Sequence, residues 1–497
     1  MAAATPPERV SPVGRHKKGG PVHARSLAGV LGLTALGLAL PGSGFLMLRR
    51  RLLGAVVLLG FASSVAVLTY LLLERRREVL QLLVQTRWLI AVMVVLGVGF
   101  LAWTAVIVAS DALSRPGGLS ARQRFGASAF TVLVCLALAV PFAVGVRYAA
   151  AQREFIRDVF APSVSATRPQ ASVDDPWLGR DRVNVLLLGG DVGSRQLGTR
   201  TDSIMVASID VDSGDTVLFG LPRNLENVPF LPGTPLARLY PQGFTGPGDP
   251  LQWMANAIYP RVPELHPGVL GETDNEGADA LKLGVSAALG IPVDYYVLVS
   301  IPGFVKLVDA MGGVTVNINQ PIPIGGSTGV REPEGYLDPG PDQRLDGFDA
   351  LWFARGRYGL DDYDRMRRQR CLLDAVIDRA DPVTLLTRYD KILEAGRDLL
   401  QTDIPAELLP AFVDLAFKVK DGPSVRSVVF DRSKSFVPES PDYAWIRKVV
   451  AKATDADAGG GGNNGGNGGG RGKRGGDAGL AKAIDSAESS CTYQPVG

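Results

Sequence analysis

Hydrophobic residues are distributed differently in the two parts of this 497-residue chain. Over roughly the first 150 positions they form long runs, whereas later they alternate with polar residues. Four apolar segments occur, at about Leu27–Leu48, Leu52–Leu73, Trp88–Ser110 and Phe125–Val146. The last three are long enough to cross a bilayer, which takes about 20 residues, but Pro41-Gly42-Ser43-Gly44 interrupts the first. We expect three membrane spans, preceded by an interfacial or re-entrant segment.

Basic residues around these segments predict their orientation. Lys and Arg are frequent before Leu52, and the loop 111–124 carries Arg115, Arg122 and Arg124. The positive-inside rule assigns both regions to the cytoplasm, so residue 150 onward lies outside the cell. Arg75-Arg76-Arg77 falls in a loop assigned to the outside and counts against this orientation. Four full spans are the alternative, and they would place both chain ends on one side.

After the apolar part, three short hydrophobic runs predict neighbouring strands of a soluble α/β domain. They cover Val183–Leu188, Ser203–Ile209 and Thr216–Leu221. Polar residues stand at their ends, and strand ends are where α/β sheets usually place their sites. These residues are Asp191, Arg200, Asp202 and Arg223. The alternative is that they are turn residues and solvated ion pairs, because turns favour Asp and Gly.

Further elements follow in alternation. An apolar face predicts a helix over Gly277–Leu289, which Gly290 would end. Strand formers predict a strand over Asp294–Ser300, then a short helix near residues 304–311 and a strand over Val314–Ile318. The segment Phe348–Ala354 is of uncertain type.

A second group of polar residues lies about 150 positions after the first. Arg355 and Arg357 precede an acidic run, and a helix is expected from there to about Ala380. On that helix Arg365, Gln369, Leu372 and Val376 share one face, so the apolar stripe continues into a cation and an amide. This favours a helix whose first turn lines a polar pocket; the alternative is a surface salt-bridge cluster.

Composition limits the chemistry of such a site. A net charge of +2 provides no field that would recruit nucleic acid, and the three His make Ser-His-Asp or zinc chemistry unexpected. Arg binds phosphate oxygens bidentately and Asp suits Mg²⁺, so a pyrophosphate site with Mg²⁺ (or Mn²⁺) is predicted. We expect Cys371 to be a small buried hydrophobic side chain; a disulfide with Cys491 is an alternative that the spacing does not require.

Seven motifs occur in a fixed order: VLLLGGD at 185–191, RTDS at 200–203, LPRN at 221–224, GIPVDYYVLV at 290–299, FVKLVDAMGGVTVNI at 304–318, LDGFDALWFARGR at 345–357 and DYDRMRRQR at 362–370. Together they resemble the LytR-CpsA-Psr (LCP) family of glycopolymer ligases. The resemblance covers roughly residues 180–382 and implies an α/β/α fold with a central mixed sheet and an apolar groove for a polyprenyl chain. It implies transfer of a phosphoglycosyl group from a polyprenyl-pyrophosphate-linked glycan to the C6 hydroxyl of muramic acid in peptidoglycan.

The same resemblance implies roles for individual residues. Asp191 and Asp202 would hold the metal, and one of them would act as base. The pyrophosphate would be held by Arg200, Arg223, Arg355, Arg357, Arg365 and Gln369, with Arg355 and Arg357 also catalytic. Two positions depart from the family pattern: Asn224 stands where Asp is more frequent and Arg370 replaces a frequent Gln, so neither receives a role.

The whole chain is therefore expected to be a multi-pass plasma-membrane protein with an extracellular catalytic domain. Two other functions stay open, a polyprenyl-pyrophosphate phosphatase and a non-enzymatic membrane transcriptional attenuator. The expected parts are a disordered cytoplasmic N-terminus (1–26), a membrane region (27–148), a linker (149–179), a catalytic domain (180–382), a C-terminal extension packed on it (383–452) and a Gly-rich flexible tail (453–497). Abundant Gly, Ala and Arg with little Lys point to a GC-rich genome.

Overall fold

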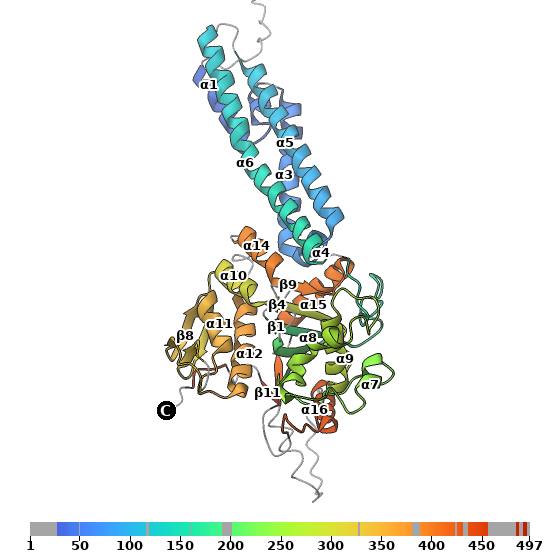
Figure 1. Cartoon of the computed structure of the whole chain (residues 1–497). Coiled ribbons are helices and arrows are strands. Elements are labelled where there is room, and N and C mark those ends of the chain that lie inside the picture. The colour runs from blue at the N-terminus through green and yellow to red at the C-terminus, as the bar shows by residue number, and fades with distance from the viewer. Residues whose placement is uncertain are drawn as a thin grey trace, which may run out of the picture. The chain divides into compact units, whose positions relative to one another are not determined.

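The structure is a computed structural model that divides into two compact units. One comprises Met1–Arg76 and Ala91–Arg147, and the other comprises Arg77–Ile90 and Tyr148–Gly497 (Figure 1). The structure describes residues 27–48, 50–115, 119–160, 162–190, 201–326, 329–379, 388–422, 425–430, 436–455, 484–486 and 491–494.

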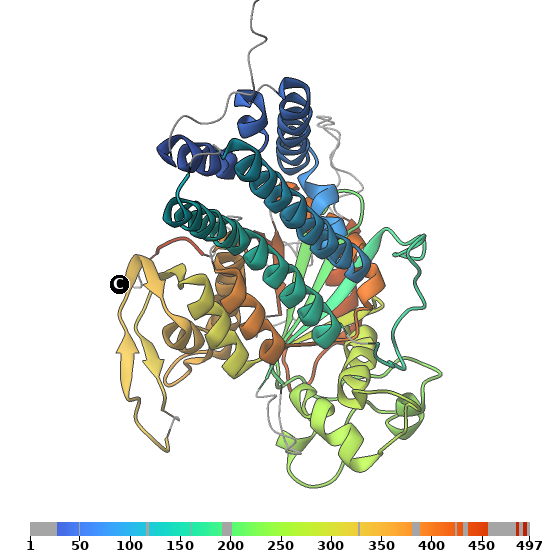
Figure 2. The ribbon, with the colours of Figure 1, turned by 90° about the horizontal axis from the view of Figure 1, so that it is seen from above.

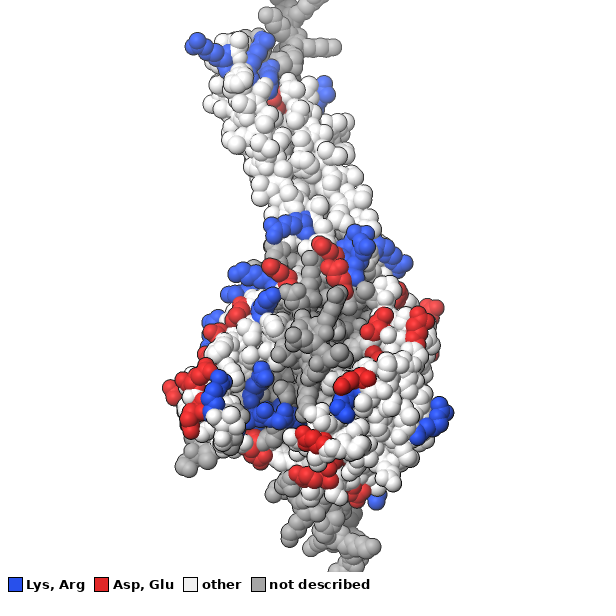
Figure 3. Space-filling view, in the orientation of Figure 1, with Lys and Arg blue, Asp and Glu red and all other residues white. Residues whose placement is uncertain are grey.

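Three helices, which lie wholly or mostly in the first unit, are long and apolar enough to cross a membrane: α3 (Arg51–Glu74), α5 (Thr86–Ser114) and α6 (Ala121–Val159). Many of their large apolar side chains are exposed, as lipid-facing residues would be. On the face shown in Figure 3, the charged side chains of this unit lie at its two ends and its middle carries none. The expected number of candidate spans is confirmed.

The first apolar segment forms two short helices instead of one long one. These are α1 (Leu27–Ala39) and α2 (Ser43–Met47), and α1 has only 13 residues, fewer than a span requires. The break lies at Gly42, whose φ of 92° favours glycine. A Cβ at Gly42 would also lie 2.9 Å from the Gly54 carbonyl oxygen of α3. The chain therefore turns where Pro41-Gly42-Ser43-Gly44 interrupts the apolar run.

The second unit is built on a seven-stranded mixed sheet with the strand order β11-β10-β3-β2-β1-β4-β9. Strand β1 runs parallel to β4 and antiparallel to β2, while β3 runs antiparallel to β2 and parallel to β10. The strands are β1 (Arg182–Gly190), β2 (Thr201–Asp210), β3 (Thr216–Leu221), β4 (Tyr295–Ser300), β9 (Leu400–Thr402), β10 (Arg426–Val429) and β11 (Ile484–Ser486).

Helices cover both faces of this sheet, which confirms the expected α/β/α arrangement (Figure 1). Alternating residues such as Leu186, Val206 and Phe219 pack on one face against α8 (Ala255–Leu265), α9 (Glu276–Leu289) and α16 (Tyr443–Asp455). Short α7 (Pro235–Leu239) and η1 (Pro250–Gln252) lie in the long loops on this side. The other face packs Val183 and Tyr295 against η2 (Ala406–Leu408) and α15 (Leu409–Asp421).

A smaller core stands beside the sheet and brings in the helix with the basic residues. Strand β5 (Val314–Ile318) pairs with β8 (Gly340–Leu345), and β6 (Ile322–Ile324) pairs with β7 (Gly335–Leu337). Figure 2 shows these strands beside α10 (Ile301–Met311), α11 (Gly347–Arg355) and α12 (Asp362–Arg379). Buried residues of all these elements form one cluster, to which α12 contributes Leu372. Two further helices are α4 (Arg76–Leu83) and α14 (Tyr389–Leu399).

The expected elements match this part of the chain closely. Helix α9 ends at Leu289, and the following Gly290 has a φ of 75°. This left-handed conformation is the one expected of a glycine that ends a helix. The segment of uncertain type is the helix α11, and Asp346 caps it by accepting a hydrogen bond of 2.9 Å from the Asp349 amide. Helix α6 continues to Val159, so the first part of the expected linker is helical.

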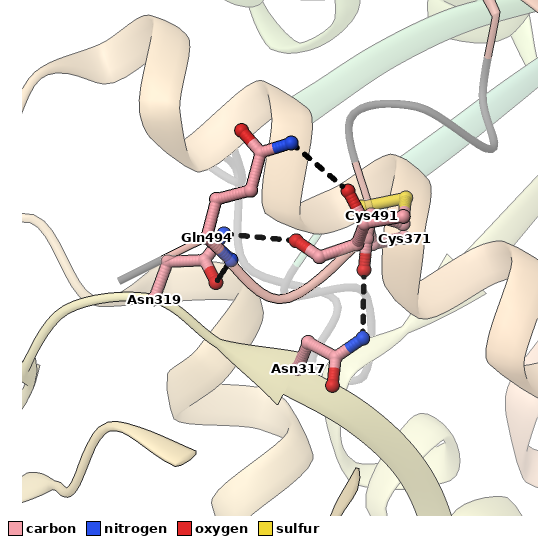
Figure 4. The surroundings of a disulfide bond; sticks show 6 residues. Asn317, Asn319, Cys371, Cys491 and Gln494 are labelled. Carbon is pink, nitrogen blue, oxygen red and sulfur yellow. Dashed lines mark hydrogen bonds between the residues drawn. A yellow bond between two sulfur atoms is a disulfide. The ribbon is translucent and has the colours of Figure 1, made fainter. Parts of the chain in front are cut away.

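The end of the chain differs from expectation. We expected a flexible tail and a hydrophobic role for Cys371, but Cys371 of α12 forms a disulfide with Cys491. Strand β11 also pairs with β10 and forms the edge of the sheet. Residues 484–486 and 491–494 therefore return to the sheet and to α12 after the Gly-rich tract. Figure 4 shows the segment from Cys491 to Gln494 beside β5, where the Asn317 amide donates to the Cys491 carbonyl at 2.9 Å.

Candidate functional site

The sheet brings several predicted strand ends to one edge. Gly190, the last residue of β1, pairs with Ser300 at the end of the parallel strand β4 and with Thr201 at the start of β2. Leu221 at the end of β3 pairs with Ile204, two residues into β2 from Asp202. Because β1, β3 and β4 run in the same direction, their carboxyl ends meet at this edge, the usual place for a site in an α/β sheet.

The predicted residues at this edge are Asp191, Arg200, Asp202 and Arg223. Asp191 and Arg200 lie outside the described residues. The backbone of Asp202 belongs to β2, and its side chain is not described. Arg223 follows β3 by two positions, is half-buried, and its carbonyl accepts a 3.0 Å hydrogen bond from the Asn256 amide. The metal assignment of Asp191 and Asp202 therefore stays a prediction.

A pocket lies between this end of the sheet and α12. Its sheet side comprises Ser203, Ile204 and Met205 of β2, Leu218, Gly220 and Leu221 of β3, and Ser427 and Val429 of β10. Its helix side comprises Arg365, Met366, Gln369 and Arg370. A Cβ at Gly220 would come within 3.2 Å of the Met366 methyl group, so glycine keeps this part of the pocket open. The pocket thus combines two cations and an amide with apolar and small residues of the sheet.

Both predicted residues of α12 line this pocket. Arg365 is only 3% exposed although it is charged, which is unusual for an Arg outside a site or an ion-pair network. The Gln369 side chain accepts a 3.1 Å hydrogen bond from the Ser203 hydroxyl and donates one of 3.2 Å to the Ala354 carbonyl. The face of α12 that carries Arg365 and Gln369 therefore lines a pocket, as their stripe predicted, but the walls of that pocket are apolar as well as polar.

Arg355 and Arg357 follow directly from the end of α11. Arg355 is half-buried and Arg357 is exposed. Gly356 stands between them, where a Cβ would approach the Pro323 carbonyl oxygen to 2.6 Å. Gln369, which lines the pocket, donates a hydrogen bond to the carbonyl of Ala354, the residue before Arg355. This bond connects the end of α11 to the pocket.

Two residues of α12 escaped the sequence analysis. Arg370 is 3% exposed and lines the pocket, although it received no role. It received no role because it stands where the family more often has Gln. Arg368 is buried, and burial lowers the pKa of its guanidinium. The basic run Arg365–Arg370 was the available signal for both.

The match to known proteins decides the family. Residues 161–433 match the family model described as the LytR_cpsA_psr family. The chain belongs to the LytR-CpsA-Psr family. The matched range includes β1–β10 and all of α12, and therefore the pocket.

Several named proteins are similar to this chain. It is 28% identical over 243 residues to the polyisoprenyl-teichoic acid–peptidoglycan teichoic acid transferase TagU of Oceanobacillus iheyensis, which covers 48% of this chain and 64% of that protein. It is 36% identical over 132 residues to the biofilm regulatory protein A of Streptococcus mutans, covering 26% of this chain and 32% of that protein. With the cell wall biosynthesis protein LcpA of Corynebacterium glutamicum it shares 29% identity over 201 residues, 39% of this chain and 35% of that protein.

Each of these alignments spans less than two thirds of the relative's own length. Among solved structures, that of Bacillus subtilis TagV is 24% identical and has a TM-score of 0.38, covering 55% of this chain and 98% of that one.

Proposed function

We propose that this LCP protein is a phosphotransferase that ligates a glycopolymer from a polyprenyl-pyrophosphate carrier to peptidoglycan. The observation that carries the proposal is the family match over the domain that contains the cationic pocket. The relatives from Oceanobacillus iheyensis and Enterococcus faecalis are named as transferases that join polyisoprenyl-linked teichoic acid to peptidoglycan. The acceptor would be the C6 hydroxyl of a muramic acid residue.

The basic residues would bind the pyrophosphate and neutralise the charge that develops on it. Arg guanidinium groups suit phosphate oxygens because their donors form a planar fork. The acceptor oxygen attacks the phosphorus that carries the glycan, and the bond from that phosphorus to the polyprenyl phosphate breaks. The acceptor proton passes to Asp191 or Asp202. Arg355, Arg357 and Arg365, with Arg200, Arg223 and Gln369, would stabilise the leaving polyprenyl phosphate.

We also propose that Asp191 and Asp202 hold Mg²⁺ or Mn²⁺. The pairing of Gly190 with Thr201, the residues adjacent to these two positions in the sequence, supports this assignment. When bound, the ion would neutralise pyrophosphate charge. Within the part of the chain that the structure describes, no group of three or more His, Cys, Asp or Glu side chains suits a metal.

The proposed location is the plasma membrane, with three spans and the LCP domain outside the cell. The three candidate spans support the multi-pass arrangement. The Cys371–Cys491 disulfide supports an extracellular domain, because disulfides persist in oxidising compartments and are rare in the cytosol.

The test uses the full chain in nanodiscs with a lipid-pyrophosphate glycan donor and peptidoglycan. We expect glycan to become wall-linked, and Arg357→Met to lower the rate roughly 100- to 1,000-fold if Arg357 meets developing charge. Arg357 is exposed, so the variant should fold normally. Arg367→Met, a nearby half-exposed cation without an assigned role, is the matched control.

Two results would contradict the ligase proposal. Release of free phosphorylated glycan without wall linkage would indicate a phosphatase. Normal wall glycan with altered gene expression in a deletion strain would favour a regulator, the kind of role suggested by the name of the Streptococcus mutans relative.

A further inference from the structure

The side chain of Arg368 joins α12 to the end of α11. Its Nε donates to the Asp364 carboxylate at 3.0 Å. Its two terminal nitrogens donate to the carbonyl oxygens of Phe353 and Gly356. The side chain is only 8% exposed. Unlike Arg365 and Gln369, Arg368 is not among the residues that line the pocket.

These contacts satisfy carbonyl groups that the end of a helix leaves without partners. The last four carbonyls of an α-helix have no intrahelical donor. Arg368 donates hydrogen bonds to the carbonyls of Phe353 and Gly356, and the Gln369 side chain donates one of 3.2 Å to the carbonyl of Ala354. Three carbonyls within four residues are therefore held by two adjacent side chains of α12.

The same backbone is confined from its other side. A Cβ at Gly356 would meet the Pro323 carbonyl oxygen at 2.6 Å and the Ile322 side chain at 2.7 Å. Gly356 is thus packed between β6 and the guanidinium of Arg368. Because Arg355 and Arg357 are the immediate neighbours of Gly356, the direction in which both side chains leave the backbone depends on this packing.

We propose that Arg368 is a positioning residue that orders the 353–357 backbone and thereby sets the pyrophosphate-binding geometry of Arg355 and Arg357. This inference rests on the proposed function. Only an Arg offers a planar set of donors that can reach a carboxylate and two carbonyls together. Asp364 neutralises its charge in the buried corner, where an unpaired cation would be costly. Arg368 would therefore act through backbone order and not through its own charge.

The test compares Arg368→Met and Arg368→Lys with the control Arg367→Met in the full chain in nanodiscs. Arg367 adjoins Arg368 and also pairs with Asp364, but at 3.7 Å and with a side chain that is 42% exposed. Amide hydrogen exchange over residues 353–358 measures backbone order. Affinity for geranylgeranyl pyrophosphate measures the site.

We expect Arg368→Met to accelerate exchange over residues 353–358 and to weaken binding roughly 10- to 100-fold, because small misplacements of binding groups have large effects. Arg368→Lys should give a partial effect, since an ammonium replaces some of the donors but not the fork. Arg367→Met should change neither measurement by more than about 2-fold. Exchange elsewhere in the chain should stay as in the wild type, which separates a local effect from general unfolding.

Each alternative result is decisive. Unchanged exchange over residues 353–358 in Arg368→Met would overturn the ordering role, and faster exchange with unchanged affinity would overturn the link to binding. Should Arg368→Met fail to fold, Arg368→Lys and Asp364→Asn provide the same comparison. If the wild-type chain does not bind the probe at all, the proposed function fails, while hydrogen exchange still decides whether Arg368 orders the corner.

Discussion

The disulfide between Cys371 and Cys491 leads to a quantitative prediction about stability. The two cysteines are 120 residues apart in sequence, so the bond removes much of the freedom of the unfolded chain. The chain-entropy estimate for a loop of this length is about 5 kcal/mol at 25 °C. Measured effects are often smaller, and we expect the double variant Cys371→Ser/Cys491→Ser to lose about 2–5 kcal/mol.

Hydrogen bonds also hold the last described segment in place. Asn317 donates to the Cys491 carbonyl at 2.9 Å, Asn319 donates to the Thr492 carbonyl at 3.4 Å, and the Gln494 amide donates to Asn319 at 2.8 Å (Figure 4). Each such bond contributes only about 0.5–1.5 kcal/mol net. Without the covalent bond, the segment should therefore detach readily from β5.

The assay is thermal unfolding of the full chain in detergent, followed by fluorescence, together with limited proteolysis near the C-terminus. The melting temperature should fall on the order of 10 °C, and the segment after β11 should become more sensitive to protease. Cys135→Ser is the control, because Cys135 is a free cysteine. Equal melting temperatures for the wild type and the double variant, with no effect of a reducing agent, would refute the reasoning.

Three further predictions concern other features of the chain. Lys282 and Asp403 form an ion pair at 2.7 Å with side chains only 1% and 2% exposed, so Lys282→Met should lower the free energy of unfolding by about 3–5 kcal/mol because it leaves the Asp403 charge buried and unpaired. The control Lys448→Met removes an exposed lysine and should change stability little. Equal melting temperatures for the two variants would contradict this prediction. Burial, with the charges of nearby carboxylates, raises the pKa of Tyr295 to about 12, so the unfolded chain ionises first and stability should fall as the pH rises from about 10 to 12. Since the Tyr295 hydroxyl has no hydrogen-bond partner among the described residues, Tyr295→Phe should retain stability at pH 7 and reduce that alkaline loss, as pH-dependent melting would show. Reporters fused before α1 and after the last residue should report opposite compartments, and a shared compartment would contradict three spans.

The sequence alone determined those features that depend on local periodicity. A continuous apolar run identified α3, α5 and α6, because a lipid environment demands about 20 apolar residues in a row. The helical period predicted that Arg365 and Gln369 lie on the same helix face as Leu372. In the structure the two polar residues line a pocket and Leu372 packs into a hydrophobic core. The order of the motifs also sufficed to indicate the family.

Tertiary structure decided the features that join residues distant in sequence. No local pattern indicates that Cys371 bonds Cys491, because a separation of 120 residues leaves no periodic signal. Arg368 looks like its basic neighbours in the sequence, and only the packing of α12 against α11 directs its guanidinium to the Phe353 and Gly356 carbonyls. Likewise, Gly220 and Ser427 border the pocket because strand order places β10 beside β3. Periodicity shows on which face of its own helix or strand a residue lies. A binding site also depends on which helices and strands pack against each other.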